Sequence, residues 1–216
     1  RCVKYTPEMV DESIEMLRLM GIPAFRAKAE GEAQAAVMAA NGQLDVVATQ
    51  DWDALLYGAP TVIRNLTSDG SKRMGRVIRA QRIELEQILA DNDLTREQLI
   101  DLGIMIGTDF HPGIKGIGPK TGLKLIKKFG DIETICEEKD KEIPERIDEI
   151  RSIFRNHPVV DVPDEDLVQG DVDVDGLKKF LVDDRQFSQK RFDNAMELLE
   201  QAGLVRTGGQ TSLFSF

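Results

Sequence analysis

Acidic side chains occur in two close pairs in the first quarter of the sequence. Glu30 and Glu32 open a stretch of small residues, and Asp51 and Asp53 directly follow an apolar run. Two carboxylates about 4 Å apart repel each other by roughly 4 kcal/mol at an effective dielectric constant of about 20. A divalent cation offsets that repulsion, and oxygen ligands suit Mg²⁺ or Mn²⁺. The two pairs therefore indicate a metal site, to which Asp109 adds a fifth carboxylate.

A pair of metal ions would give such a site a definite chemistry. Two divalent cations about 4 Å apart stabilise in-line attack on a phosphodiester. A simpler interpretation treats each acid alone, with Asp51 as a helix N-cap and Glu30 and Glu32 as first-turn acids that favour the helix dipole. Two pairs behind successive elements favour the metal site over this alternative. Trp52, between two of the acids, is interpreted as a packing residue.

A second group of candidate residues is basic. The segment 115–128, KGIGPKTGLKLIKK, holds five lysines and no acid, in a chain of net charge −10. Its Gly-x-Gly does not follow a strand, so the dinucleotide fingerprint fails its context. Two helices joined by a glycine hairpin instead present backbone N–H groups that hold phosphate without reading sequence. The alternative is a solvated lysine face. The expected DNA-binding residues are Lys115, Gly116, Gly118, Lys120 and Lys124.

The order of helix and strand signals predicts elements that would position these residues. Strands are expected over 22–27 and 44–49, so that each acidic pair follows the carboxyl end of a parallel strand. Further strands are expected over 61–66 and 75–85, and the pattern is helical from residue 86 onward. The predicted fold class is α/β, with a mostly parallel sheet flanked by helices, a helix-hairpin-helix region and a helical C-terminal part.

Composition sets further bounds. We expect an α/β core over 1–85, a helical region over 86–202 with the DNA-binding element at 104–130, and a flexible tail over 203–216. No apolar run approaches the roughly 18 residues of a membrane span and no signal peptide is visible, so we expect a cytoplasmic protein without a membrane partner. The first residue is Arg1 rather than Met, and we expect a fragment or processed chain.

Three segments together resemble a known family. AEGEAQAA, ATQDWDALLYG and IGTDFHPGIKGIGPKTGLKLI resemble, in order and spacing, the flap endonucleases of the structure-specific 5′-nuclease family in their archaeal form. The resemblance implies a PIN-like core with two Mg²⁺ ions, which Mn²⁺ can replace. It also implies that the hairpin 113–118 binds the backbone of duplex DNA and a K⁺ ion. In the C-terminal tail, it implies that a sliding clamp is bound by Gln210, Leu213 and Phe216. The implied catalytic and metal-ligating residues are Glu30, Glu32, Asp51, Asp53 and Asp109.

The implied function is a monomeric 5′ flap endonuclease and 5′–3′ exonuclease acting on branched, nicked or gapped duplex DNA in replication and repair. The family's N-terminal part, with further metal-site aspartates, has no counterpart in this sequence, and Lys28-Ala29 replace its usual Pro-Ser. The alternative is therefore a non-catalytic DNA- and clamp-binding fragment. A nucleotide-binding α/β enzyme, the third class, fails because no phosphate loop follows a strand.

Overall fold

A computed structural model describes residues 5–73 and 75–205 of the chain. Contacts divide the chain into two compact units, one made of residues 27–160 and the other of residues 1–26 with 161–216. This division does not coincide with the boundary that the sequence pattern predicts after residue 85. The physical reason is that helices beyond that boundary pack on elements before it, within the unit 27–160.

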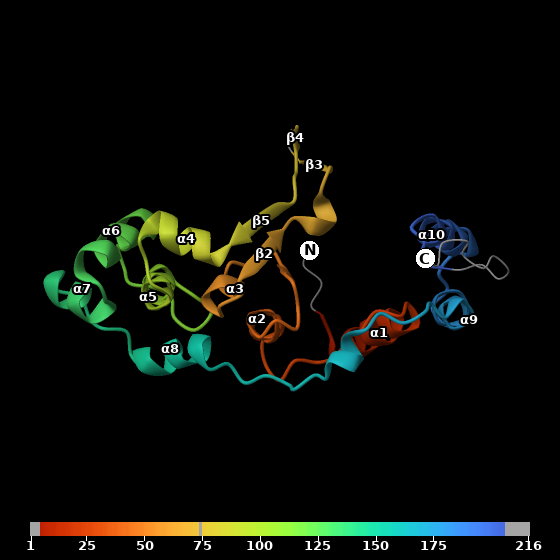
Figure 1. Cartoon of the computed structure of the whole chain (residues 1–216), viewed down its shortest axis with the longest axis horizontal. Helices are drawn as coiled ribbons and strands as arrows, with labels where there is room; N and C mark the ends of the chain where they lie inside the picture. Colours follow the sequence, from red (N-terminus) through yellow and green to blue (C-terminus); the bar gives the residue numbers. More distant parts are fainter. Residues whose placement is uncertain (1–4, 74, 206–216) are drawn as a thin grey trace, which may run out of the picture. The chain divides into compact units, whose positions relative to one another are not determined.

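The sheet of the unit 27–160 is small and mixed (Figure 1). Its strand order is β1–β2–β5, in which β1 (Val47–Ala48) runs parallel to β2 (Thr61–Arg64) and β2 runs antiparallel to β5 (Gln81–Glu84). The expectation of a mostly parallel sheet is therefore corrected. The segment 22–27 is not a strand, and Pro23 within it has no N–H to donate to a ladder.

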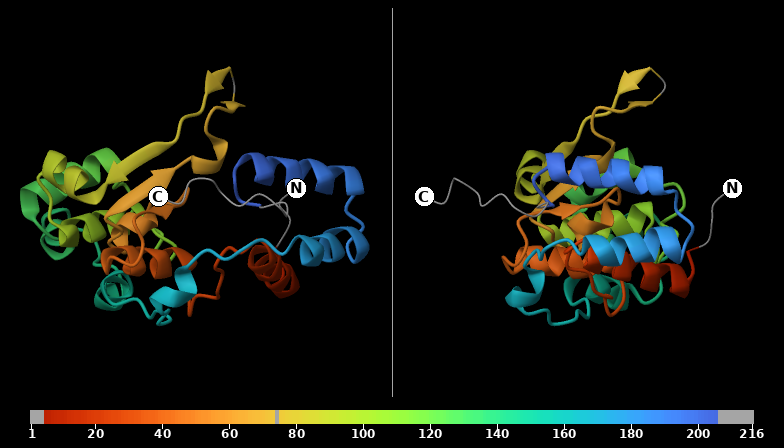
Figure 2. Two further views of the ribbon diagram at one scale, coloured as in Figure 1. Left: turned by 45° about the vertical axis from the view of Figure 1, so that its right-hand side comes forward. Right: turned by 90° about the vertical axis from the view of Figure 1, so that its right-hand side faces the viewer.

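A two-stranded hairpin separates β2 from β5. After the 3₁₀ turn η1 (Leu66–Ser68), β3 (Lys72–Arg73) pairs antiparallel with β4 (Arg76–Val77). Figure 2 shows this hairpin projecting beyond the three-stranded sheet. Its base is closed by Asp69, whose Oδ1 accepts a hydrogen bond from the Ala80 N–H at 2.7 Å.

Helices surround the sheet and form the rest of the unit 27–160. They are α2 (Gly31–Ala40), α3 (Asp53–Leu56), α4 (Leu85–Asn92), α5 (Arg96–Ile106), α6 (Pro119–Phe129), α7 (Ile132–Glu138) and α8 (Ile147–Arg155). A capping box of Thr95 and Gln98 starts α5. Gly122 of α6 lies close to Leu102 of α5: a Cβ there would meet the leucine side chain at 2.8 Å. The two helices therefore pack closely beside the hairpin segment.

A buried arginine joins three of these helices. Arg151 of α8 is 8% exposed, and its Nε and Nη2 donate to the carboxylate of Asp101 on α5 at 2.7 and 2.8 Å. Its Nη1 and Nη2 also donate to Glu133 on α7 at 2.6 and 2.8 Å. Asp101 in turn accepts from the Ile132 N–H at 3.3 Å, where α7 begins. The network fixes α5, α7 and α8 to one another.

The other unit is helical. It contains α1 (Pro7–Leu19), η2 (Asp164–Leu167), α9 (Val174–Lys178), the π-helical turn η3 (Lys179–Asp183) and α10 (Gln189–Gln201). Thr6 caps α1 and Pro7 opens it, as the sequence predicts. Leu19, Leu177 and Phe192 form the buried core of this unit. Gln210, Leu213 and Phe216, expected to bind a clamp, lie outside the described residues.

No helix within 5–73 or 75–205 is both long and apolar enough to cross a membrane.

Candidate metal centre and nucleic-acid interface

The two acidic pairs lie at the starts of two helices, α2 and α3. Asp51 and Asp53 follow β1 as expected, but no strand of the described residues precedes Glu30 and Glu32. Glu30 stands at the N-cap position of α2, yet its side chain makes no capping hydrogen bond. Asp51 follows β1, and its Oδ1 accepts from the Asp53 N–H at 3.1 Å. This bond is a local turn bond, because the N-cap of α3 is Trp52 and α3 has no side-chain cap. Helix capping therefore accounts for neither Asp51 nor Glu30.

Thr49 connects the two pairs. Its hydroxyl donates to the carboxylate of Glu32 and accepts from the Asp51 N–H, the latter at 3.0 Å. The Thr49 N–H continues the parallel ladder by donating to the Ile63 carbonyl at 3.2 Å. The carboxyl end of β1 thus holds Glu32 beside Asp51. The sequence analysis missed Thr49, although a threonine between a strand and an acid is a recognisable local-turn signal.

Asp109 belongs to the same electrostatic group. The pKa of Asp53 is raised to about 6, mainly by partial burial and to a smaller extent by the negative charges of Asp51, Asp109 and Glu32. Asp109 follows α5 in a tight turn, where Thr108 and His111 exchange backbone hydrogen bonds of 2.8 and 3.2 Å. Three separate segments therefore bring mutually repelling carboxylates to one place.

Tyr57 and His157 lie behind these acids. The pKa of the Tyr57 hydroxyl is raised, mainly by burial and to a smaller extent by the negative charges of Glu30 and the other acids. The rings of Tyr57 and His157 meet edge to face, with centroids 5.1 Å apart and an interplanar angle of 71°. The Nε2 of His157 accepts from the Glu30 N–H at 3.4 Å. The sequence offered no signal for either residue, because their contacts join segments far apart in the chain.

The donor chemistry of the acids fits a hard divalent cation. Carboxylate oxygens are the ligands that Mg²⁺ and Mn²⁺ prefer, and a cation would relieve the repulsion felt by Asp53. Within the described ranges, however, no three His, Cys, Asp or Glu side chains are already grouped to hold one ion. Glu30, Asp51 and Asp109 are exposed. Exposed side chains change rotamer readily, so these carboxylates can turn toward a bound ion.

The predicted basic segment 115–128 comprises the end of the hairpin that follows α5 and most of α6. Gly113 and Gly116 both have φ +88°, and a Cβ on Gly113 would lie 2.5 Å from the Ile106 carbonyl oxygen. Ile114 N–H donates to the Met105 carbonyl at 2.8 Å, which fixes the hairpin to α5. The exposed lysines of this segment are Lys115, Lys120, Lys124, Lys127 and Lys128. Every ion pair between described residues is made by an arginine, so none of these lysines pairs with a described acid. Lys128 Nζ lies 4.6 Å from the centroid of the Phe129 ring.

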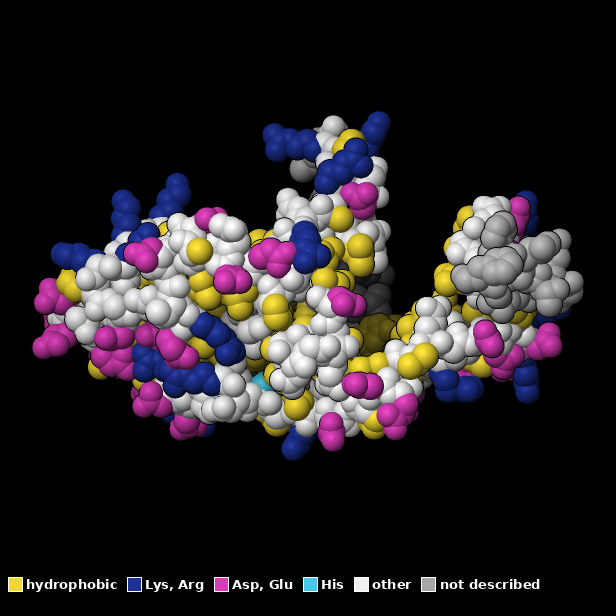
Figure 3. Space-filling view, viewed as in Figure 1, with side chains coloured by type: hydrophobic (Ala, Val, Ile, Leu, Met, Phe, Trp, Pro, Cys, Tyr) yellow, Lys and Arg dark blue, Asp and Glu magenta, His cyan; other side chains and the backbone are white. Residues whose placement is uncertain are grey.

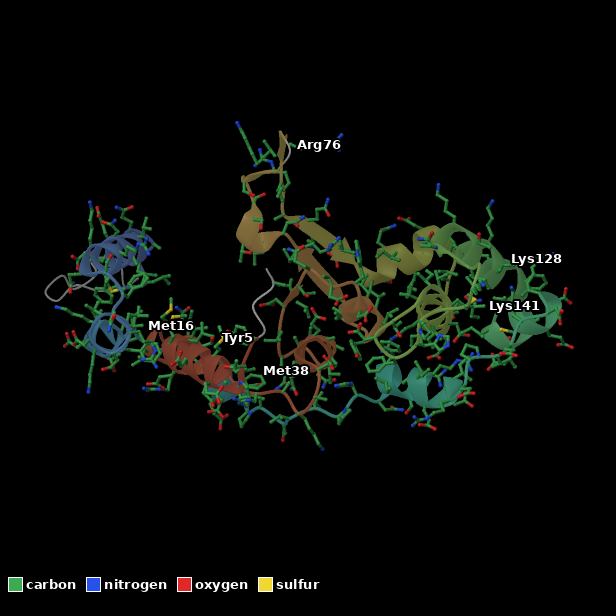
Figure 4. The ribbon with its side chains drawn as sticks, turned by 180° about the vertical axis from the view of Figure 1, so that it is seen from behind. Tyr5, Met16, Met38, Arg76, Lys128 and Lys141 are labelled. Atoms are coloured by element: carbon green, nitrogen blue, oxygen red, sulfur yellow. The ribbon has the colours of Figure 1, made fainter. Side chains whose placement is uncertain are left out.

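The β3–β4 hairpin forms a second basic surface, which the sequence analysis missed. Residues 71–82 hold five Lys and Arg side chains and no acid, a signal comparable to that of 115–128. Lys72, Arg76 and Arg79 are exposed. Figure 3 shows cationic side chains gathered at the end of this hairpin and over α6, and Figure 4 labels Arg76 at the hairpin's outer end. Both basic surfaces belong to the unit that carries the acids.

Comparison with known proteins finds a matching family model and similar folds. Residues 21–109 match the XPG I-region. The catalytic core of Rad2 in complex with DNA substrate has a similar fold, with a TM-score of 0.74 over 92% of this chain and 71% of that chain at 24% identity. That identity supports the fold alone. The chain therefore shares its fold with this catalytic core.

The particular relatives are archaeal flap endonucleases. Flap endonuclease 1 of Methanosarcina barkeri is 44% identical over 97% of this chain and 62% of its own length, and that of Pyrococcus furiosus is 39% identical over 100% and 63%. Flap endonuclease-1 from Methanococcus jannaschii has a TM-score of 0.73 at 38% identity, over 91% of this chain and 58% of that one. The chain is thus similar to the archaeal flap endonucleases, as its motifs predict, and spans about three fifths of their length.

Proposed function

We propose that this chain carries the metal-binding and DNA-gripping parts of a structure-specific nuclease that cuts 5′ flaps and branched, nicked or gapped duplex DNA. The observation that carries the proposal is the gathering of acids from three segments around Asp53, whose pKa is raised to about 6 by partial burial first and then by the charges of Asp51, Asp109 and Glu32. Repelling carboxylates gathered at a strand edge are unfavourable for folding and favourable for holding cations. The names of the relatives supply the substrate class.

The five acids differ in exposure, and we propose that they differ accordingly in how they bind the metal ions. Glu32 and Asp53 are partly buried and fixed near Thr49, whereas Glu30, Asp51 and Asp109 are exposed and complete the ligand set. When bound, two Mg²⁺ ions supply the positive charge that stabilises in-line attack of water on a phosphodiester. Because water is the nucleophile, no side chain has to form a covalent bond with DNA. Mn²⁺ is expected to replace Mg²⁺ because both accept the same oxygen ligands.

The hairpin 113–118 and α6 would hold the duplex. Backbone N–H groups at the start of α6 and the exposed Lys115, Lys120 and Lys124 contact phosphates, which positions DNA without reading its sequence. A monovalent cation such as K⁺ at the hairpin carbonyls is part of the same proposal. In this proposal the lysines of α6 contact phosphates of the duplex, and the scissile phosphate lies at the acids.

The remaining expectations stay predictions. They are a sliding clamp at Gln210, Leu213 and Phe216, a role in replication and repair, exonuclease as well as endonuclease activity, a monomeric state and a cytoplasmic location. The clamp residues belong to a segment outside the described residues. Deletion of residues 209–216 should abolish clamp binding in a titration while leaving clamp-free cleavage unchanged.

A cleavage assay tests the proposal. The full-length gene product and the 216-residue chain would each be incubated with flap DNA in millimolar Mg²⁺. We expect cleavage by the full-length protein, and Asp51→Asn should lower turnover by orders of magnitude while DNA affinity stays within several-fold. Asp45→Asn, which alters an exposed acid before β1, is the matched control and should cleave normally. DNA binding without cleavage by the full-length protein would support the non-catalytic alternative instead.

A further inference from the structure

Trp52 is an exposed aromatic side chain in the middle of the acidic loop. It stands between Asp51 and Asp53, and 50% of its surface is accessible to solvent. The packing role expected from the sequence therefore does not account for it. Single exposed aromatic residues are common on protein surfaces, so the groups around Trp52 decide what it does.

Arg64 holds the indole of Trp52 in place. Its guanidinium carbon lies 4.2 Å from the centroid of the indole, and its Nη2 donates to the Gln50 carbonyl at 3.0 Å. Arg64 is the last residue of β2, which runs parallel to β1. The loop that carries Trp52 follows β1, and Arg64 ends the parallel strand β2. Both therefore lie at the carboxyl ends of these strands, close to Asp51 and Asp53.

This contact contributes little to folding stability. The Nε of Arg64 is buried and has no hydrogen-bond partner among the described residues. An exposed cation–π pair stabilises a protein by less than a buried unpaired donor usually destabilises it. A fixed and exposed ring is, however, preorganised for a ligand, because it loses little conformational entropy when it binds.

We propose that Trp52, supported by Arg64, is a stacking platform for an unpaired base beside the phosphodiester that reaches the acids; this inference rests on the proposed function. An indole offers a flat apolar face to any base, so the contact is independent of sequence. Bases within a duplex are already stacked on one another and gain little from it. The platform therefore selects DNA in which a single strand leaves the duplex at the site, and Arg64 adds positive charge to an acidic loop.

Intrinsic fluorescence tests the contact directly, because Trp52 is the single tryptophan of the 216 residues. The chain would be titrated in Ca²⁺, a larger divalent cation, with three labelled DNAs: a fully paired duplex, the same duplex with a 5′ single-stranded arm, and the armed duplex with abasic residues at the junction. Anisotropy of the label reports binding in the same samples. We expect strong quenching of Trp52 by the armed DNA alone.

Variants separate stacking from general binding. Trp52→Leu should bind armed DNA about 10-fold more weakly and the paired duplex as before. Trp52→Phe retains an aromatic face and should recover most of the affinity, and Arg64→Met should lie between the two. Leu198→Ala removes a side chain that is 65% exposed on α10, and should leave both affinities unchanged.

The outcomes distinguish this inference from the proposed function. Equal quenching by armed and abasic DNA, or wild-type affinity of Trp52→Leu for armed DNA, would overturn the platform while leaving cleavage untouched. Base-dependent quenching in a full-length protein that never cleaves would uphold the platform and overturn the nuclease. No binding of any of the three DNAs would overturn both. If Trp52→Leu bound all three DNAs more weakly by the same factor, the platform would also be overturned. Loss of stacking on unpaired bases cannot weaken the binding of a fully paired duplex.

Discussion

The carboxyl group of Asp53 lies where burial and three neighbouring acids act together. These influences raise its pKa to about 6. The unfolded chain releases the same proton near the ordinary value of about 3.9. Between these values the folded state holds more protons than the unfolded state, so the free energy of unfolding falls as pH rises. Above about pH 6 the metal-free fold carries the full repulsion of this group.

Asp53→Asn should therefore stabilise the metal-free chain while abolishing its proposed activity. After allowance for solvent screening, we expect a gain of about 1 kcal/mol at pH 7.5 and almost none at pH 4. Urea unfolding at the two pH values, in EDTA, measures the difference. Asp45→Asn, at an exposed position, should show no such pH dependence. Equal stability of wild type and Asp53→Asn at pH 7.5 would show that the acids do not repel in solution.

At the level of secondary structure, two glycines of the hairpin differ in what limits them. Gly113 and Gly116 share φ +88°, which disfavours any side chain. At Gly116 a Cβ would meet nothing within 4 Å, whereas at Gly113 it would lie 2.5 Å from the backbone oxygen of Ile106. Backbone cannot move aside as a flexible side chain can. Gly113 is therefore restricted by this contact as well as by its backbone conformation, whereas Gly116 is restricted by its conformation alone.

Substitution of these two glycines by alanine should separate the two effects. Gly116→Ala is expected to lower the free energy of unfolding by about 1 kcal/mol, from backbone strain alone. Gly113→Ala should lower it by roughly 2–3 kcal/mol or more, and should also weaken duplex binding because the hairpin must shift from α5. Thermal unfolding and DNA titration of both variants provide the measurement. Indistinguishable variants would mean that the hairpin is not held against Ile106.

Arg151 ties three helices together, and its loss should be severe. Arg151→Met leaves the buried carboxylate of Asp101 without its partner, which typically costs about 3–5 kcal/mol. Arg155→Met breaks only the half-exposed pair with Glu97 and should cost about 0–1 kcal/mol. Urea unfolding at pH 7 compares the two variants. Similar losses in both would place Arg151 outside the core network.

The same network predicts a loss of stability in acid. The hydrogen bond from Arg151 lowers the pKa of Glu133. A lowered pKa in the folded state means that the stabilising contribution is complete above the ordinary glutamate pKa and disappears as pH falls through the lowered value. Wild type should therefore lose stability in that window, and Arg151→Met should lose less of it. Unfolding curves measured from pH 6 to pH 2 would reveal an equal acid loss if the network plays no part.

At the level of the whole molecule, charge is unevenly distributed. The chain carries a net charge of −10, yet the segments 71–82 and 115–128 each hold five basic residues and no acid. Such segments attract a polyanion while the remaining surface repels it, which favours binding in one orientation. The salt dependence of DNA binding therefore reports on a few side chains rather than on the net charge.

Lys120→Ala together with Lys124→Ala should flatten that salt dependence. Each duplex phosphate contact contributes a slope of about −0.9 in the logarithm of affinity against the logarithm of salt concentration, so we expect a change of about one to two units. Duplexes of different sequence should be weakened alike. Lys178→Ala with Lys179→Ala, in the other unit, serves as a control for lost charge. An unchanged slope in the α6 variant would mean that these lysines face solvent in the complex.

Much of this architecture could be predicted from local sequence, and the exceptions have physical causes. Thr6 and Pro7 start α1, and Pro119 and Gly130 bound α6, as expected, because caps depend on neighbouring residues. The strand expected over 22–27 fails and the sheet is mixed, because pairing partners are set by distant segments.

The site was only partly predictable for the same reason. The raised pKa of Asp53 reflects burial and then the charges of Asp51, Asp109 and Glu32, while the metal-binding roles of the five acids stay predictions. His157 reaches the Glu30 backbone from 127 residues away, and no local pattern announces that contact. The position of Trp52 likewise depends on Arg64 in β2, so a tryptophan interpreted as a packing residue is half exposed.

The smaller unit is assembled from both ends of the chain, and this has a consequence for synthesis on the ribosome. Helix α1 is made early, but the partners of Leu19 are Leu177 and Phe192. At a translation rate of about 5–20 residues per second, α1 waits on the order of ten seconds or more for them. During that interval its apolar stripe has no native partner. We therefore expect nascent chains of this protein to expose this stripe to ribosome-associated chaperones, and slow codons between the two segments to prolong the exposure.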